Sequence, residues 1–108
     1  MTNQEAFTTV VLHLRKQGRR AKENSKCRYR APDGCMCAIG ALIPDDQYTP
    51  ELEGNNVRAL SDLPALQDLN LNLLHDLQIL HDTVDPENWE NQFAFLARTY
   101  KLEVPKHD

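Results

Sequence analysis

Three cysteines and two later histidines are the side chains of this sequence that best suit nucleophilic or metal chemistry. Cys27, Cys35 and Cys37 follow a C-x7-C-x-C pattern, and His75 and His81 lie well downstream. Thiolate and imidazole groups are ligands that zinc prefers, but structural zinc sites use cysteines paired at C-x2–4-C spacing. Free cysteine also packs in protein interiors as a small apolar group. We therefore keep the three cysteines and His81 as a candidate thiol or zinc site, and we expect no bound metal or other cofactor.

A second arrangement would place Cys37, His81 and Asp82 together as thiolate, base and orienting carboxylate. Nucleophilic cysteines usually lie at a helix start or a strained turn near oxyanion donors, and Cys37 precedes a segment that suits a short helix. The competing interpretation is that Cys37 packs in the interior and that His81 lies at the margin of the core. The sequence contains no glycine-rich phosphate loop, no H-E-x-x-H and no G-x-S-x-G motif. We assign no catalytic residue and favour a protein that is not an enzyme.

Basic side chains are concentrated in one short segment. Residues 15–30 carry eight of the twelve Lys and Arg residues and one acid, whereas residues 31–108 carry four bases and fourteen acids. The candidate binding residues of the basic segment are Arg19, Arg20, Lys26, Arg28, Tyr29 and Arg30. Such cations contact phosphates, and tyrosine stacks on bases, so one interpretation is nucleic-acid binding. The other is that these cations pair with the protein's own acids Asp45, Asp46, Glu51 and Glu53.

Acidic side chains follow the polar sides of the C-terminal part of the chain. They are Asp62, Asp68, Asp76, Asp82, Asp85, Glu87 and Glu90. An acidic face either steers toward a basic partner surface or is simply a solvated exterior. Charge segregation without catalytic motifs predicts a non-enzymatic accessory protein that binds a macromolecular partner, foremost a protein. Nucleic-acid binding through residues 15–30 and a thiol or zinc site at Cys35 and Cys37 with His81 are the alternatives.

The N-terminal residues predict a helix over residues 3–17. Thr2 and Glu5 have capping-box spacing, and Gly18 suits the position just past the helix end. Apolar side chains recur at helical spacing, at Phe7, Val10, Val11 and Leu14.

The middle of the chain predicts one short β-hairpin near residues 26–37. Residues 26–30 alternate in character, Pro32-Asp33-Gly34 suits a turn, and residues 35–37 would return as the second strand. Residues 38–43 either extend that strand or form a short buried helix, which their composition favours. Residues 44–56 read as a loop with one helical turn at Pro50–Glu53.

Residues 60–100 form a leucine-rich part that predicts helices over about 61–68 and 69–83 and a last helix from Asp85-Pro86. Residues 101–108 read as a tail that frays beyond Pro105. The expected fold is therefore mainly α (α+β), a bundle-like single domain over residues 1–108 with one short hairpin. No apolar run approaches the length of a membrane span, the first residues do not resemble a secretory signal, and we expect a cytoplasmic protein with free thiols.

A longer pattern resembles a group of small uncharacterised proteins from bacteria, phages and plasmids. It comprises C-x-Y-R-x-P-D-G-x-x-C-A-I-G-x-L-I-P-D from Cys27 to Asp45, then Tyr48, Glu53-Gly54, L-Q-x-x-H-D from Leu77 to Asp82, and Trp89. The pattern spans most of the chain. No activity is established for that group, so the resemblance implies a prokaryotic or mobile-element setting and no mechanism.

Overall fold

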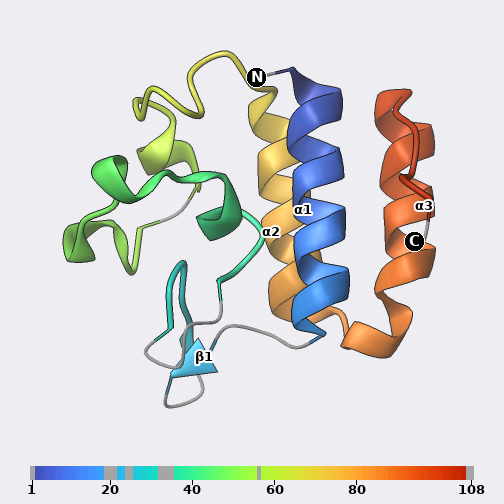
Figure 1. Ribbon diagram of the computed structural model, residues 1–108, viewed down its shortest axis with the longest axis horizontal. Coiled ribbons are helices and arrows are strands. Elements are labelled where there is room, and N and C mark those ends of the chain that lie inside the picture. Colours follow the sequence, from blue (N-terminus) through green and yellow to red (C-terminus); the bar gives the residue numbers. More distant parts are fainter. Residues whose placement is uncertain (1, 19–21, 24–25, 32–35, 56, 107–108) are drawn as a thin grey trace.

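Three α-helices are the longest elements of the computed structural model (Figure 1). They are α1 (Asn3–Gln17), α2 (Leu71–Thr83) and α3 (Trp89–Tyr100), and α3 runs antiparallel to the other two (Figure 1). The structure describes residues 2–18, 22–23, 26–31, 36–55 and 57–106, and of residues 22, 23, 26 and 27 it describes the backbone. The predicted mainly helical fold is confirmed.

Helix α1 has the predicted bounds and caps. The Glu5 amide donates to the Thr2 hydroxyl, while the Glu5 carboxylate accepts from the Thr2 amide. Gly18 ends the helix with a φ of 70°, a left-handed conformation that glycine adopts without steric cost. The apolar side chains that the sequence placed on one face of this helix are buried, namely Phe7, Val10, Val11 and Leu14.

Helix α2 begins at Leu71, with the Asn70 side chain accepting from the amides of Asn72 and Leu73. The additional helix predicted over 61–68 is wrong, because this segment forms a series of turns. Pro64 lacks an N–H, and the Ala65 amide donates to the Gln47 side chain at 3.0 Å instead of to a helical carbonyl. The last helix is entered through the 3₁₀ helix η5 (Pro86–Asn88), with Asp85 at its cap position.

Four further 3₁₀ helices shape the segment between the basic region and α2. They are η1 (Gly40–Leu42), η2 (Asp45–Gln47), η3 (Pro50–Leu52) and η4 (Val57–Leu60). The short helix favoured within residues 38–43 is therefore present as η1, and the helical turn predicted at Pro50–Glu53 is present as η3. In Figure 1 this looped segment lies to one side of the three α-helices.

The β-hairpin predicted near residues 26–37 is not seen in the described residues, and its predicted turn at residues 32–34 lies outside them. Strand β2 (Lys26–Cys27) pairs antiparallel with β1 (Lys22–Glu23), upstream of the expected partner. Between the two predicted strands, the described residues show one isolated bridge, Arg30 to Met36, and a hydrogen bond from the Cys37 amide to the Tyr29 carbonyl. The Tyr29 amide, which a ladder would pair with the Cys37 carbonyl, donates to the Glu53 carboxylate, and the Cys37 carbonyl accepts from the Ala41 amide. The Gln17 side chain binds the outward-facing N–H and carbonyl of Met36.

One core joins the helices to the looped segment. Its largest fully buried side chains are Phe7, Phe93, Leu14, Ile39, Leu60, Leu66, Leu73, Leu74, Leu77, His81, Val10 and Val11. The tail folds back over α1, because Gln4 exchanges two hydrogen bonds with the Glu103 backbone and Arg15 donates to the Pro105 carbonyl. Fraying was predicted beyond Pro105, and of that stretch residues 107–108 lie outside the described part.

No helix within the described ranges combines the length and the apolar character that crossing a membrane requires.

Candidate functional site

Glu53 organises the part of the basic segment that the structure describes. Its carboxylate accepts from the backbone amides of Tyr29 and Arg30 at 2.9 and 3.1 Å, and also from the Tyr48 hydroxyl. The Nε of Arg28 lies 3.4 Å from the same carboxylate. The bond from the Tyr29 amide occupies the donor that a strand pairing with residue 37 would need.

Arg30 is bound within the protein. Its guanidinium donates to the Ile43 carbonyl at 2.9 Å, lies 2.8 Å from the Asp45 carboxylate and stacks over the Tyr48 ring at 4.5 Å. The interpretation that the basic segment pairs with the protein's own acids is therefore confirmed for Arg28 with Glu53 and for Arg30 with Asp45. Of the other candidate binding residues, Arg19, Arg20 and the Lys26 side chain lie outside the described part.

Cys37 is a fully buried free thiol. Its sulfur accepts from the Gly40 amide at 3.2 Å, and burial raises the pKa of the thiol to about 12. Gly40 is required here, since an added Cβ would lie 2.0 Å from the Tyr29 carbonyl oxygen. A thiol that is protonated at neutral pH and closed off from solvent cannot attack a substrate. Cys37 therefore packs in the interior, as the competing interpretation expected.

His81 is also fully buried. Its Nδ1 donates to the Asp82 carboxylate at 2.8 Å, and its ring stacks on Trp89 with centroids 6.3 Å apart. The base and carboxylate of the hypothetical triad are thus in contact, but neither the imidazole nor the Cys37 thiol is accessible to a substrate. The hydrogen bond from His81 holds the Asp82 carboxylate in place.

No cluster of three or more His, Cys, Asp or Glu side chains suited to a metal ion occurs in the described part of the chain. Cys35 and the Cys27 side chain lie outside that part, so the candidate thiol or zinc site is described only at Cys37 and His81, both of which are fully buried.

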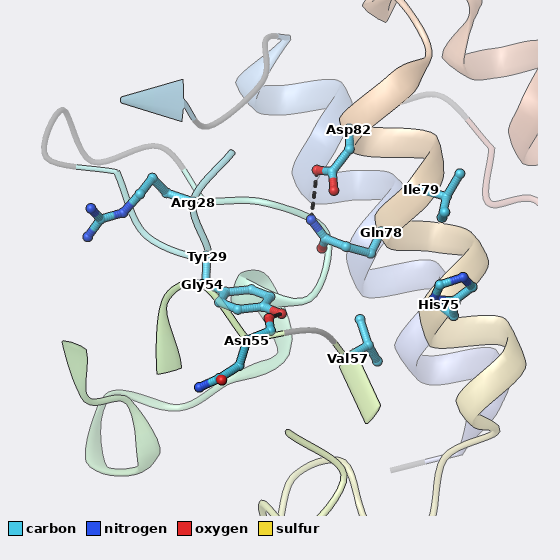
Figure 2. Close-up of a pocket in the computed structure, with 9 residues that line it drawn as sticks. All are labelled: Arg28, Tyr29, Gly54, Asn55, Val57, His75, Gln78, Ile79 and Asp82. Atoms are coloured by element: carbon cyan, nitrogen blue, oxygen red, sulfur yellow. Dashed lines mark hydrogen bonds between the residues drawn. The ribbon is translucent and has the colours of Figure 1, made fainter. Parts of the chain in front are cut away.

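A pocket lies between the loop around Tyr29 and one face of α2 (Figure 2). Its polar lining consists of Arg28, Tyr29, Asn55, His75, Gln78 and Asp82, and Gly54, Val57 and Ile79 complete it. The cavity volume is about 310 Å³. This Tyr29 pocket joins two residues of the basic segment to the acidic helix, which the sequence did not predict to meet.

Within the Tyr29 pocket, hydrogen bonds fix most of the polar side chains. Gln78 donates to the Asp82 carboxylate at 2.8 Å and accepts from the Ile39 amide at 3.3 Å. The Tyr29 hydroxyl donates to the Asn55 carbonyl, and burial is the main cause that raises the pKa of this phenol. The pocket is therefore built from groups held in place before any ligand arrives.

A second hollow, the α2–α3 groove, runs between the two C-terminal helices with a volume of about 290 Å³. It is lined by Asp76, Ile79, Leu80, Thr83, Val84, Gln92, Phe95 and Leu96. Ile79 and Phe95 are 47% and 54% exposed, and they belong to the three large apolar side chains that the described residues expose. The third is Leu12 on α1, at 43%.

Sequence reasoning missed Ile79, Phe95 and Gln78. Ile79 lies off the buried stripe of α2, and Phe95 lies off that of α3. A large apolar residue outside the apolar stripe of an amphipathic helix was the available signal. Gln78 belongs to the L-Q-x-x-H-D pattern and lies one helical turn before Asp82, whereas its contact with Ile39 forms only in the folded chain.

No protein-family model matches this chain, and no curated protein or solved structure is significantly similar to it. The function must therefore be argued from the surface itself.

Proposed function

We propose that this chain is a non-enzymatic accessory protein that binds another protein through the α2–α3 groove, and that its partner contributes a basic amphipathic helix. The observation that carries the proposal is the pair of exposed apolar side chains, Ile79 and Phe95, on the two walls of one groove. The prokaryotic or phage setting and the cytoplasmic location belong to the proposal and have the sequence pattern as their support.

An amphipathic helix is the occupant that fits such a groove. Two helices that expose apolar side chains across a groove offer the surface on which a third helix lays its own apolar face. Leu80 and Leu96 form a buried apolar floor below the two exposed side chains. Covering Ile79 and Phe95 would contribute about 1–3 kcal/mol each at most, which suits a transient complex.

Charge selects a basic partner. Residues 71–100 contain five acids, Asp76, Asp82, Asp85, Glu87 and Glu90, and one arginine, Arg98. A basic helix would gain favourable long-range attraction, whereas a nucleic acid or a second copy of the same acidic face would be repelled. The groove is therefore assigned to a partner whose binding helix carries Lys or Arg around its apolar face.

The nucleic-acid alternative has less support. Arg15, Arg28 and Arg30 each have a carboxylate partner within the protein, at Glu90, Glu53 and Asp45. An Arg28→Ala/Arg30→Ala variant would also release the contacts of Arg30 with Ile43 and Asp45, so loss of DNA binding in it would not separate recognition from folding.

A panel of synthetic helical peptides tests the proposal. Each peptide carries leucines at i, i+3, i+4 and i+7, with either Lys and Arg or Glu on the remaining face, and fluorescence anisotropy measures its affinity. We expect basic peptides to bind and acidic ones not to. Ile79→Ser should weaken binding by about tenfold, whereas Leu12→Ser, which alters a similarly exposed side chain on α1, should leave it unchanged.

Three outcomes would contradict the proposal. Basic peptides that bind no better than acidic ones would remove the charge argument. Equal effects of Ile79→Ser and Leu12→Ser would show that the peptides do not bind in the α2–α3 groove. Sedimentation that shows a dimer of the wild type and a monomer of Ile79→Ser would assign the groove to a second copy of the chain.

A further inference from the structure

Ile79 belongs to both hollows of α2. Of the residues of α2, His75, Gln78, Ile79 and Asp82 line the Tyr29 pocket. The α2–α3 groove is lined on the same helix by an adjacent set that includes Asp76 and Ile79. Residues three and four apart are neighbours on a helix surface, so these are two adjoining stripes that meet at Ile79. One ligand that crosses Ile79 therefore reaches both hollows.

Asp82 presents a fixed carboxylate to the Tyr29 pocket. Its Oδ1 accepts from Gln78 and from the buried His81, both at 2.8 Å. Among the described side chains and amides none donates to Oδ2, and the Asp82 side chain remains 34% exposed. Figure 2 shows the carboxylate directed from α2 toward the loop that carries Tyr29. The free oxygen can accept a hydrogen bond from a ligand without rearrangement of the helix.

The Asp82 carboxylate favours a cationic ligand, and Arg28 does not make the pocket favour an anion instead. Its Nε lies 3.4 Å from the Glu53 carboxylate, and in Figure 2 its guanidinium points away from Asp82. An anionic ligand would place its charge beside the Asp82 carboxylate, where like charges repel. The charge that acts on a ligand at the α2 wall is therefore negative.

The walls of the pocket suit the stem of a long basic side chain. Val57, Ile79 and Tyr29 line the same pocket as the carboxylate and contribute apolar atoms to it. Lysine and arginine bury their methylene stems along such surface while the charged head meets a polar group. A volume of about 310 Å³ is at the lower end for ligand pockets, which suits one side chain better than a large molecule.

We infer that the Tyr29 pocket is a recognition pocket for one arginine or lysine side chain, with Asp82 as the residue that binds its charged group. The inference rests on the proposed function in one respect: the side chain comes from the partner helix that crosses Ile79 into the α2–α3 groove. Asp82 then selects the residue that the partner places beside its apolar anchors, and this sets the register of the complex.

A matched pair of small probes tests the pocket without any partner. N-acetyl-arginine methylamide and its citrulline counterpart have nearly the same shape, but the ureido group of citrulline is neutral. Titration of the ¹⁵N-labelled full chain should shift amide signals in residues 54–57 and 75–82 with the arginine probe, at an affinity about threefold to tenfold above that for citrulline. N-acetyl-glutamate methylamide should cause no such shifts.

Two variants locate the effect. Asp82→Asn should abolish the difference between the arginine and citrulline probes, whereas Asp62→Asn, which neutralises an exposed acid in the turn segment before α2, should preserve it. Because Asp82 also holds Gln78 and His81, thermal unfolding of the variant is measured alongside, and the comparison of the two probes on the wild type does not depend on it. Equal binding of the two probes, or preference for glutamate, would overturn the inference.

The outcome also separates this inference from the proposed function. If the arginine probe binds, Asp82→Asn abolishes that binding and no basic helical peptide binds, the inference about the Tyr29 pocket stands and the proposed function of the α2–α3 groove is wrong. Basic peptides that bind equally well to Asp82→Asn, and equally well when each arginine is replaced by citrulline, would retain the groove and reject the pocket.

Discussion

At the scale of single residues, burial decides what the sulfur and imidazole groups do. Cys37 and His81 are enclosed, and each uses hydrogen bonds to stabilise the fold: Cys37 accepts from Gly40, and His81 donates to Asp82. Of Cys37, His81 and Asp82, the residues of the hypothetical triad, Asp82 is the one with an accessible side chain.

The reactivity of Cys37 follows from this burial. In a Cys27→Ser/Cys35→Ser protein, Cys37 is the sole thiol, and its pKa of about 12 leaves little thiolate at pH 8. Alkylation by iodoacetamide should then be about a thousandfold slower than for free cysteine on ionisation alone, and slower still because the site is closed. Mass spectrometry of timed samples measures the rate. Alkylation as fast as that of glutathione would show that Cys37 is accessible.

The same groups make stability depend on alkaline pH. Burial raises the pKa of the Cys37 thiol from 9.0 to about 12 and also raises that of the Tyr29 phenol. Above about pH 9 the unfolded chain therefore loses protons that the folded chain keeps, so the free energy of unfolding falls as the pH rises. The urea midpoint should drop between pH 7.5 and 10.5, and it should drop less in Cys37→Ala. An equal drop in the two proteins would mean that Cys37 does not contribute.

Some residue roles could be predicted from the sequence and others could not. The pairing of the basic segment with the protein's own acids was one stated interpretation, because both groups are visible as clusters. The hydrogen bonds from the amides of Tyr29 and Arg30 to Glu53 were not predicted, since these residues precede Glu53 by 24 and 23 positions in the sequence. Hydrogen bonds across such separations leave no local periodicity in the sequence.

At the scale of elements, the helices follow their patterns and the predicted hairpin does not. Helix α1 has the bounds that its caps and apolar spacing predict, because those signals are local. In the described residues the hairpin ladder does not extend, because the Tyr29 amide donates to Glu53 and the Cys37 carbonyl accepts from Ala41 instead of pairing with each other. The turns over residues 61–69 reflect Pro64, whose effect outweighs the leucine spacing.

Truncation of a side chain on the buried face of α2 should lower stability much more than truncation on its exposed face. Leu77 is fully buried and Ile79 is 47% exposed, although they lie two residues apart. Leu77→Ala should lower the free energy of unfolding by about 2–5 kcal/mol, because it leaves a cavity in the core. Ile79→Ala should change it by less than about 1 kcal/mol. Urea denaturation measures both, and a similar cost for the two variants would mean that the face of α2 is misassigned.

At the scale of the whole molecule, the charge distribution and the exposed apolar side chains coincide on the C-terminal helices. The basic segment is in part neutralised by Glu53 and Asp45. Of the acids in residues 71–100, Asp76 lines the α2–α3 groove and Asp82 lines the Tyr29 pocket. The acidic face was visible in the sequence. The groove was not, because it depends on how α2 packs against α3.

The proposed attraction between the acidic helices and a basic peptide is partly electrostatic, so affinity for basic helical peptides should fall severalfold between 50 and 300 mM salt. Over this range the screening length for exposed charges falls from about 14 Å to about 6 Å. Binding should persist at high salt, since the apolar contacts of Ile79 and Phe95 are not screened. Anisotropy titrations at four salt concentrations measure the slope. Binding that vanishes completely at high salt would indicate charge alone and would remove the groove from the account.

The most direct measurement is a map of the bound surface. The ¹⁵N-labelled chain is titrated with the tightest basic peptide of the panel, and amide shifts are recorded for the assigned residues. Shifts should concentrate in residues 75–84 and 92–96, on both sides of Ile79, and should be small along α1. Shifts confined to residues 15–30 and α1, with residues 75–84 and 92–96 unchanged, would contradict the account.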